Sequence, residues 1–318
     1  MSDLISVIVP AYNAEKLIEN TLNSVLNQTY KNFEVIVVND GSKDRTKEIC
    51  ESFVRKDTRF KHVYQDNAGV SMARNKGIEL SQGKYICFLD ADDYFDKTYL
   101  EKMHLSISSG DCDICYCGIS YIYVNKGKEK KLKTRFTQKK VLINAMSGKI
   151  KWSIIAIMFN KDFLKKNNIL FRRGLSSGED TEFGYLAFAS SNKICFVSQY
   201  LVYSHRGHSA TQLSTLSLDM IDLKYESYQR LILDDRIRIN KRNENLLINF
   251  GLNGATVCRL NNAIKQNFDK EEIIRYYDKY ADIINKYTFN NGLRSIKLNY
   301  VRFKLIRTIK KWKKELGR

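Results

Sequence analysis

The sequence predicts an α/β protein built on a doubly wound, mainly parallel sheet. Short apolar runs rich in β-branched and aromatic residues alternate with segments whose apolar residues recur at helical spacing. Such alternation is typical of parallel strands joined by crossover helices that cover both faces of the sheet. Toward the C-terminus only helical spacing remains. We therefore expect a sheet domain over residues 1–212 and a helical, basic region over residues 213–318.

The expected strands are short apolar runs, each followed by a polar turn. They are residues 5–9, 33–38, 60–64 and 84–89, and the helices between them are residues 15–28, 44–55 and 70–80. Pro10 ends the first strand because it has no N–H to donate to a ladder. Beyond residue 118 the pattern loosens into a basic hairpin or loop at 126–140 and two short strands at 194–197 and 200–203.

Carboxylates gather where the fourth strand ends. Asp90, Asp92 and Asp93 follow it within four residues, and like charges so close are costly unless they are neutralised. Ligands of open α/β sheets bind at the carboxyl ends of the strands. A Mg²⁺ or Mn²⁺ ion that bridges a carboxylate to a phosphate would account for the arrangement. The alternative is a polar loop that opens a helix, with Asp96 as its cap.

Asp40 ends the second strand, so it should lie on the same edge of the sheet and could accept a hydrogen bond from a nucleobase. The sequence contains neither G-x-G-x-x-G after the first strand nor a P-loop. A nucleotide would therefore be held through its base, its ribose and a metal-bridged diphosphate.

Charge and composition narrow the choice of partner and compartment. The formal net charge of +18 favours an anionic partner. We find no secretory signal and no apolar run of about 18 residues, the length a membrane span needs. The odd number of scattered cysteines fits a reducing compartment, so we expect a cytoplasmic protein.

Several short motifs occur in order over residues 4–212. They are Val9-Pro10-Ala11-Tyr12-Asn13, Val38-Asn39-Asp40-Gly41-Ser42-Lys43-Asp44, Asn67-Ala68-Gly69-Val70-Ser71-Met72-Ala73-Arg74-Asn75, Leu89-Asp90-Ala91-Asp92-Asp93 and Gly178-Glu179-Asp180. With these motifs the sequence resembles the family 2 glycosyltransferases of bacterial surface-glycan assembly, which have the GT-A fold. The C-terminal third lies outside the resemblance.

The resemblance implies transfer, with inversion, of a hexose or N-acetylhexosamine from a UDP-sugar to a hydroxyl of a glycan acceptor. The acceptor could be lipid-linked, a polymer or attached to a protein, and the cofactor would be Mn²⁺ or Mg²⁺. Two alternatives stay open. A sugar nucleotidyltransferase shares such a sheet but needs a Gly-rich loop where this chain has residues 10–13. A non-enzymatic polyanion-binding protein would explain the charge but not the ordered carboxylates.

The resemblance also implies roles for individual residues. Asp180 would be the general base, with an N-cap as its purely structural alternative. The nucleotide-sugar would be bound by Pro10, Ala11, Tyr12, Asn13, Asp40, Arg74, Asp90 and Arg206. The metal would be held by Asp92, with Asp93, His205 and His208 as further candidate ligands.

The C-terminal segment has an apolar stripe at helical spacing, formed by Leu298, Val301, Leu305, Ile309, Trp312 and Leu316. From residue 302 to 318 there are eight Lys or Arg and one acid, Glu315. A basic amphipathic helix of this kind is typical of peripheral binding to an anionic membrane. The alternative is packing on its own domain or in a homo-oligomer. We do not expect nucleic acid as a partner.

Overall fold

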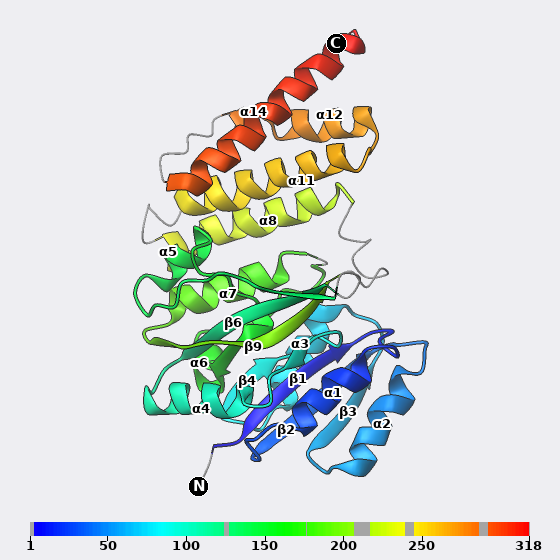
Figure 1. Cartoon of the computed structure of the whole chain (residues 1–318), viewed down its shortest axis with the longest axis vertical. Coiled ribbons are helices and arrows are strands. Elements are labelled where there is room, and N and C mark those ends of the chain that lie inside the picture. The colour runs from blue at the N-terminus through cyan, green and yellow to red at the C-terminus, as the bar shows by residue number, and fades with distance from the viewer. Residues whose placement is uncertain are drawn as a thin grey trace. The chain divides into compact units, whose positions relative to one another are not determined.

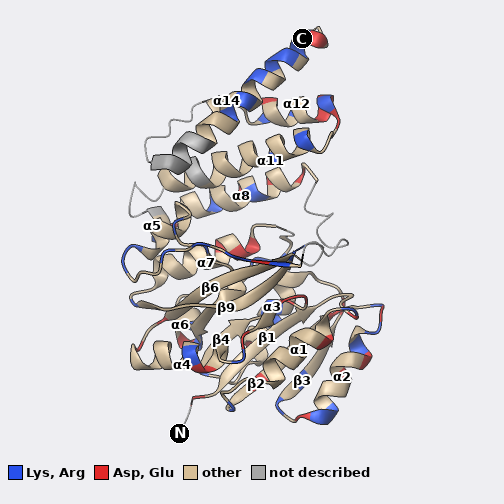
Figure 2. Ribbon diagram, viewed as in Figure 1, with Lys and Arg blue, Asp and Glu red and all other residues tan. Residues whose placement is uncertain are grey.

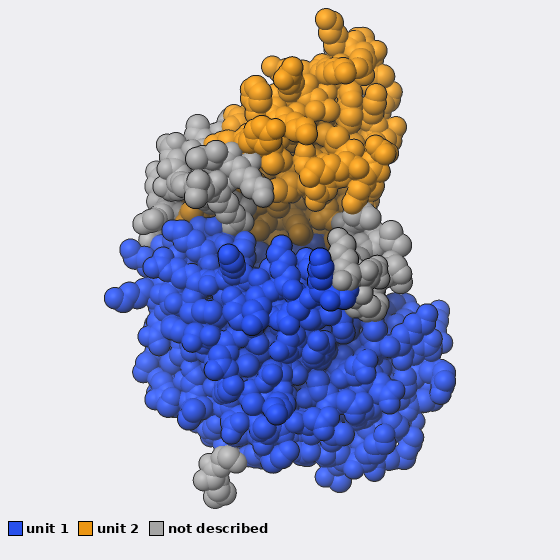
Figure 3. All heavy atoms as spheres, in the orientation of Figure 1, with its two compact units in different colours: residues 1–208 blue, residues 209–318 orange. Residues whose placement is uncertain are grey.

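A computed structural model of the chain describes residues 3–123, 127–175, 177–206, 217–238, 245–285 and 292–317. Residues 1–208 and 209–318 form two compact units, which we describe one at a time (Figure 3). The expected domain boundary, between residues 212 and 213, falls outside the described residues.

The first unit is built on one nine-stranded sheet with the order β3-β2-β1-β4-β8-β6-β9-β5, and β7 pairs with β6. Its first half is parallel, as expected, and consists of β1 (Ile5–Ala11), β2 (Phe33–Asp40), β3 (Phe60–Gln65) and β4 (Tyr85–Phe88). The crossover helices are α1 (Ile18–Leu26), α2 (Thr46–Lys56) and α3 (Val70–Leu80). Helices α1 and α2 cover one face and α3 the other, which follows from right-handed crossovers in this strand order (Figure 1).

The second half of the sheet is mixed, because β8 runs antiparallel to both of its neighbours, β4 and β6. Its strands are β5 (Tyr94–Phe95), β6 (Ile114–Tyr123), β7 (Lys128–Lys131), β8 (Ile157–Asn160) and β9 (Ile194–Arg206). The helices around it are α4 (Tyr99–Ser109), α5 (Val141–Met146), the 3₁₀ turn η2 (Ile154–Ala156), α6 (Lys161–Lys166) and α7 (Glu179–Ser190). The expected basic hairpin is present, since β7 pairs antiparallel with β6.

The two short strands expected at 194–197 and 200–203 are one strand, β9. Its register against β6 shifts between the pairs Tyr116–Phe196 and Gly118–Tyr200. Residues 198–199, which we expected to separate two strands, therefore lie in an irregularity within one strand. A Cβ on Gly118 would lie 2.8 Å from the Tyr200 ring, which explains why the irregularity contains a glycine.

Helix α3 lies unusually close to the sheet. A Cβ on Gly77 would come within 2.2 Å of Cγ2 of Ile8, so this crossing of α3 over β1 requires a glycine. The strand beneath it is buried along its whole length. This contact fixes the height of α3 above the sheet, and with it the position of Arg74 one turn earlier.

The second unit is helical, as expected. Its elements are α8 (Met220–Leu233), α9 (Asp235–Arg238), the π-helical η4 (Leu247–Asn253), α11 (Gly254–Lys265), α12 (Lys270–Lys279), α13 (Ala281–Asn285) and α14 (Gly292–Glu315). A single apolar core joins α8, α11, α12, α13 and α14 through residues such as Ile221, Leu260, Ile273, Ile284 and Leu305. None of the helices within the described residues has the length and hydropathy to span a membrane.

The apolar stripe of the C-terminal helix faces this core. Leu305 and Ile309 are 0% and 1% exposed, and Val301 and Trp312 pack against the same cluster. The middle of the stripe therefore packs within its own unit, whereas Leu316 at its end is 42% exposed. Membrane binding through this helix stays a prediction.

Candidate active site

The loops after β1 and β2 are tied to each other at the carboxyl edge of the sheet. The Asn13 amide donates to Ser42 Oγ (3.0 Å), and the Lys43 amide donates to Asn13 Oδ1 (2.9 Å). Asn13 has φ +47°, a left-handed conformation that asparagine tolerates better than most residues. Of the predicted nucleoside residues that precede it, Pro10 and Ala11 are buried in β1, while Tyr12 is 48% exposed.

Asp40 is buried and already holds the turn that leads into α3. Its carboxylate accepts hydrogen bonds from Gln65 Nε2 (2.7 Å) and from the amides of Ala68 (2.8 Å) and Gly69 (2.9 Å). A carboxylate has about four acceptor positions, so one position remains for a nucleobase N–H. Asp40 therefore fixes the start of α3 as well as being the predicted base reader.

Arg74 brings together two motifs that lie far apart in the sequence. Its guanidinium is 3% exposed and donates to Asp90 Oδ1 (2.8 Å) and to Asp180 Oδ1 (2.6 Å). Glu179 Oε1 lies 3.5 Å away. The ring of Phe171 lies 5.1 Å below the guanidinium. We expected Arg74 beside the nucleoside pocket, and the structure places it between the predicted ribose-binding carboxylate and the predicted base.

The charged groups in this cluster shift one another's pKa. Burial opposes the charge on Arg74, but the carboxylates of Asp180, Asp90 and Glu179 outweigh it and raise the pKa of Arg74. Removal from water, reinforced by Glu179 and Asp90, raises the pKa of Asp180 to about 7, although Arg74 acts in the opposite direction. The side chain of Asp180 nevertheless keeps 36% of its surface exposed, so it remains accessible to a substrate.

The acidic loop after β4 is held in place from α1. The Thr21 hydroxyl donates to the main-chain oxygens of Ala91 (2.9 Å) and Asp93 (2.8 Å). The Asp93 amide closes a turn onto the Asp90 oxygen at 3.0 Å. These bonds present Asp90 and Asp92 at the edge of the sheet.

Asp93 points inward. Its side chain accepts the His205 amide (2.9 Å) and the residue is 4% exposed, so it ties the acidic loop to β9. Burial, together with the charges of Asp90 and Asp92, raises the pKa of Asp93 to about 8. The contact with the His205 amide turns this carboxyl toward β9, and its role as a metal ligand stays a prediction.

The His205 ring contacts the main chain of Asp92. His205 Nδ1 lies 2.5 Å from the Asp92 carbonyl oxygen. A proton on Nδ1 that donates to this carbonyl makes Nε2 the nitrogen with the lone pair, as a metal-binding histidine requires. Burial and the charge of Asp90 raise the pKa of Asp92, and a cation would relieve this repulsion.

These donors fit a divalent ion whose coordination is completed by a substrate. Carboxylate and imidazole suit Mn²⁺, and Mg²⁺ is commonly held by one or two carboxylates plus substrate phosphates. Within the ranges that the structure describes, no group of three or more His, Cys, Asp or Glu side chains could hold a metal ion.

The remaining predicted residues lie on or after β9. The Arg206 guanidinium stacks 4.1 Å from the Tyr121 ring centroid, and its charge lowers the pKa of Asp92. His208 lies outside the described residues.

Sequence reasoning missed the residues that position others. Thr21 and Gln65 hold Asp93 and Asp40 as described above. Asn75 exchanges two hydrogen bonds with the main chain of Phe171, donating at 2.7 Å and accepting at 2.9 Å, and so keeps the Phe171 ring under Arg74. Of these residues only Asn75 carried a signal, because it lies within the motif that contains Arg74.

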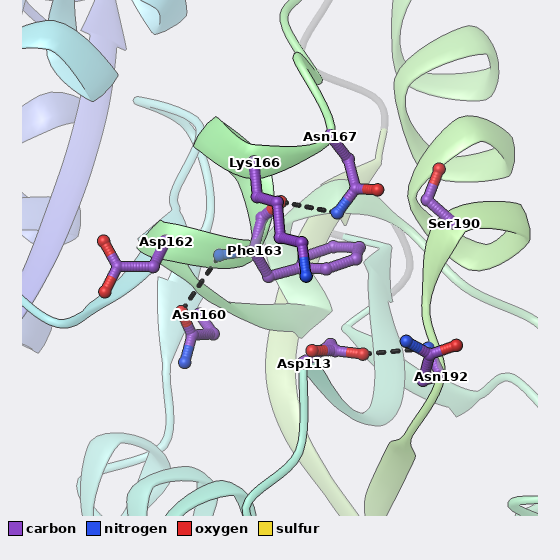
Figure 4. A pocket seen from close by; sticks show the side chains of 8 residues that line it. All are labelled: Asp113, Asn160, Asp162, Phe163, Lys166, Asn167, Ser190 and Asn192. Carbon is purple, nitrogen blue, oxygen red and sulfur yellow. Dashed lines mark hydrogen bonds between the residues drawn. The ribbon is translucent and has the colours of Figure 1, made fainter.

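A pocket of about 300 Å³ elsewhere in the first unit is lined by other residues (Figure 4). These are Asp113, Asn160, Asp162, Phe163, Lys166, Asn167, Ser190 and Asn192. Asp113 is occupied structurally, accepting from Ser191 and from the amides of Asn192 and Lys193. None of the residues predicted to bind the nucleotide-sugar or metal lines this pocket, so we do not assign it to the active site.

Comparison with known proteins establishes the family. The model of glycosyl transferase family 2 matches residues 6–175. EpsJ of Bacillus subtilis, an uncharacterized glycosyltransferase, is 31% identical over 221 residues, which are 67% of this chain and 64% of EpsJ. TuaG of B. subtilis, a putative teichuronic acid biosynthesis glycosyltransferase, is 42% identical over 118 residues, 37% of this chain and 47% of TuaG. The chain thus matches less than two thirds of the length of either relative.

Solved structures agree on the fold. S. aureus TarS 1–349 in complex with UDP-GlcNAc has a TM-score of 0.72 at 22% identity, covering 99% of this chain and 92% of that one. The mannosyltransferase PcManGT from Pyrobaculum calidifontis, in complex with GDP-Man and Mn²⁺, has a TM-score of 0.59 at 15% identity over 96% and 86% of the two chains. The chain belongs to glycosyl transferase family 2. Its first unit has the GT-A fold, and a helical region follows this unit in the sequence.

Proposed function

We propose that this protein is an inverting glycosyltransferase that moves a hexose or N-acetylhexosamine from a UDP-sugar to a hydroxyl of a glycan acceptor. The observation that carries the proposal is the convergence of Arg74, Asp90 and Asp180 on one edge of the sheet. Asp90, the proposed ribose-binding carboxylate, and Asp180, the proposed base, contact the same buried guanidinium, so both would lie near a bound nucleotide-sugar. Family membership supports the reaction, and the UDP-GlcNAc complex of TarS supports the choice of UDP.

Asp180 would act as the general base. As the acceptor hydroxyl attacks the anomeric carbon, the carboxylate takes its proton, a contribution that is typically about 10²–10⁴-fold. With a pKa of about 7, Asp180 is ionised in a useful fraction of molecules at neutral pH and is a stronger base than an ordinary carboxylate. Arg74 would keep the carboxylate oriented.

The cofactor would be Mn²⁺ or Mg²⁺, held by Asp92 and His205 together with the donor's diphosphate. The ion would supply positive charge opposite the departing diphosphate. Arg206, whose charge already reaches Asp92, would add to this field. A diphosphate neutralised in this way would leave without protonation, so one catalytic carboxylate would suffice.

The acceptor would be a surface polysaccharide intermediate, a lipid-linked oligosaccharide or a protein-linked glycan, extended on the cytoplasmic side of the cell membrane. This class of acceptor is supported by the relatives, one of which is TuaG, a putative teichuronic acid biosynthesis glycosyltransferase.

The experiment is a screen of UDP-sugars by UDP release with Mn²⁺ present, followed by acceptor mixtures with the best donor. Asp180→Asn should lower turnover at least a hundredfold while UDP binding by calorimetry stays within about threefold of the wild type. Glu179→Gln is the matched control, because Glu179 contacts the same guanidinium at longer distance. If Glu179→Gln loses turnover and Asp180→Asn does not, the base is Glu179.

A further inference from the structure

Among the described side chains of α14, the exposed ones are aromatic or basic, apart from Glu315 in the last turn. Tyr300 and Phe303 are 67% and 69% exposed, among the most exposed large hydrophobic side chains of the described residues. The exposed residues that continue this side toward the C-terminus are Lys304, Arg307, Lys310, Lys311 and Lys314. Because residues 300, 303, 307, 310 and 314 are separated by three or four positions, they lie on one face of the helix, which we call the outer face.

The outer face lies opposite the apolar stripe. Leu305 and Ile309 of the stripe are buried in the core that α11 and α12 also line, so this side of the helix is held in place and the outer face points away from the core. Within the described part of α14 the only acid is Glu315, which pairs with Lys270 of α12 (3.5 Å) and with Lys311 (3.7 Å). Blue cationic segments accordingly recur along the C-terminal half of α14 (Figure 2).

We propose that the outer face of α14 binds an anionic lipid surface. Lys and Arg near such a surface are attracted to its phosphates, and aromatic rings favour the headgroup region, where an apolar ring meets water. Both kinds of residue lie on one straight face here, with the aromatic pair at one end and the cations along the rest. The contact therefore uses the side of the helix opposite the stripe that sequence analysis singled out.

Other occupants fit this face less well. A second copy of the chain in a two-fold dimer would set the same basic face against itself, and like charges would repel. A soluble polyanion would satisfy the cations but would leave Tyr300 and Phe303 exposed. A lipid headgroup layer satisfies both.

The inference does not rest on the proposed sugar transfer, and its test has a separate readout. The full-length protein is sedimented with vesicles of phosphatidylglycerol and phosphatidylcholine, and with vesicles of phosphatidylcholine alone. We expect binding to the anionic vesicles only, weakened by salt because exposed charges are screened. UDP release from the donor is measured in parallel and should be the same for all variants below.

Two variants separate the charges from the rings. Arg307→Gln/Lys310→Gln/Lys314→Gln should weaken binding about a hundredfold, since each cation near an anionic surface contributes about fivefold. Tyr300→Ser/Phe303→Ser should weaken it about tenfold by removing the apolar part. The matched control is Arg55→Gln/Lys97→Gln/Lys165→Gln, which removes the same charge from exposed positions of the first unit and should bind like the wild type.

Three outcomes would overturn the proposal. The wild type could fail to sediment with anionic vesicles, or the control triple variant could lose as much binding as the α14 triple variant. Alternatively, soluble polyphosphate at equal phosphate concentration could compete fully while Tyr300→Ser/Phe303→Ser binds vesicles normally. The last result would identify the face as a polyanion site. Circular dichroism of each variant verifies that the helices remain folded.

Discussion

At the scale of single residues, one guanidinium organises the centre of the site. Arg74 is buried and stands between Asp90 and Asp180, each of which keeps about a third of its side-chain surface exposed, at 34% and 36%. The carboxylates are thus fixed on their inner side and open on their outer side. Arginine suits this position better than lysine because its planar fork can bond two carboxylates at once.

The first prediction concerns this fork. Arg74→Ala should lower the free energy of unfolding by about 2 kcal/mol, less than the 3–5 kcal/mol of a fully buried pair because the carboxylates are partly solvated. Activity should fall with it, and Arg74→Lys should recover stability more than activity. Urea unfolding measures the free energy of unfolding, with Lys47→Ala as control, since the exposed Lys47–Glu51 pair should be worth under about 1 kcal/mol. Equal losses in the two variants would contradict the central role of Arg74.

The second prediction concerns pH. The raised pKa of Asp180, about 7, means that kcat/KM should rise with pH and level off above about pH 7, because the base works only when ionised. Between about pH 4 and 7 the folded protein holds a proton on Asp180 that the unfolded chain has lost, so stability falls as pH rises through this window. Asp93 shifts in the same direction, so the difference between the wild type and Asp180→Asn isolates Asp180. An activity profile flat from pH 5 to 8 would contradict this assignment.

At the scale of elements, sequence and structure agree where local pattern decides and differ where distant pairing does. Strands β1 and β2 are buried at every position, so their apolar runs could be read directly. The two-residue β5 exists because it pairs with β9, and the irregularity in β9 exists because of its register on β6. No local pattern encodes such pairings.

In the candidate active site, too, local motifs could be read from the sequence and contacts between distant residues could not. The motifs predicted Asp40, Asp90 and Asp180, but not that Arg74 would join the last two across 16 and 106 residues. Asp93 was predicted only as a further candidate ligand beside Asp92, and its contact with the His205 amide, which turns it inward, could not be read from the motif. Proximity of residues distant in the chain depends on packing, which spacing alone does not determine.

The third prediction concerns the packing of α3. Gly77→Ala would place a methyl group 2.2 Å from Ile8 Cγ2, so the helix must shift and carry Arg74 with it. We expect a loss of about 1–3 kcal/mol in unfolding free energy and a clear loss of turnover. Ile8→Ala in the same chain should restore part of the turnover by making room. Glu79→Ala, at an exposed position of the same helix, should change stability by less than about 0.5 kcal/mol.

At the scale of the whole molecule, the proposed chemistry and the basic outer face of α14 belong to different units. The first unit holds the residues of the proposed chemistry, and the second combines its own core with the basic outer face of α14. Part of the net charge of +18 is therefore carried by the exposed cations of one helix, α14.

The fourth prediction concerns the response of the whole chain to ligand. UDP with Mn²⁺ should raise the Tm, since a ligand at a hundred times its Kd stabilises by about 2.7 kcal/mol. UDP with EDTA should raise it much less, and Asp92→Ala should abolish the difference between the two conditions. Differential scanning fluorimetry measures all four cases. An identical shift with EDTA and with Mn²⁺ would show that the nucleotide binds without the ion.

The hydrogen bonds of Asp40 bear on how such a protein could be re-engineered. One carboxylate is both the predicted reader of the nucleobase and the clamp on the amides of Ala68 and Gly69, immediately before the helix that carries Arg74. A designer who replaced Asp40 to change nucleotide preference would also release that helix start. New selectivity would therefore have to be sought in the surrounding loops, with Asp40 left in place.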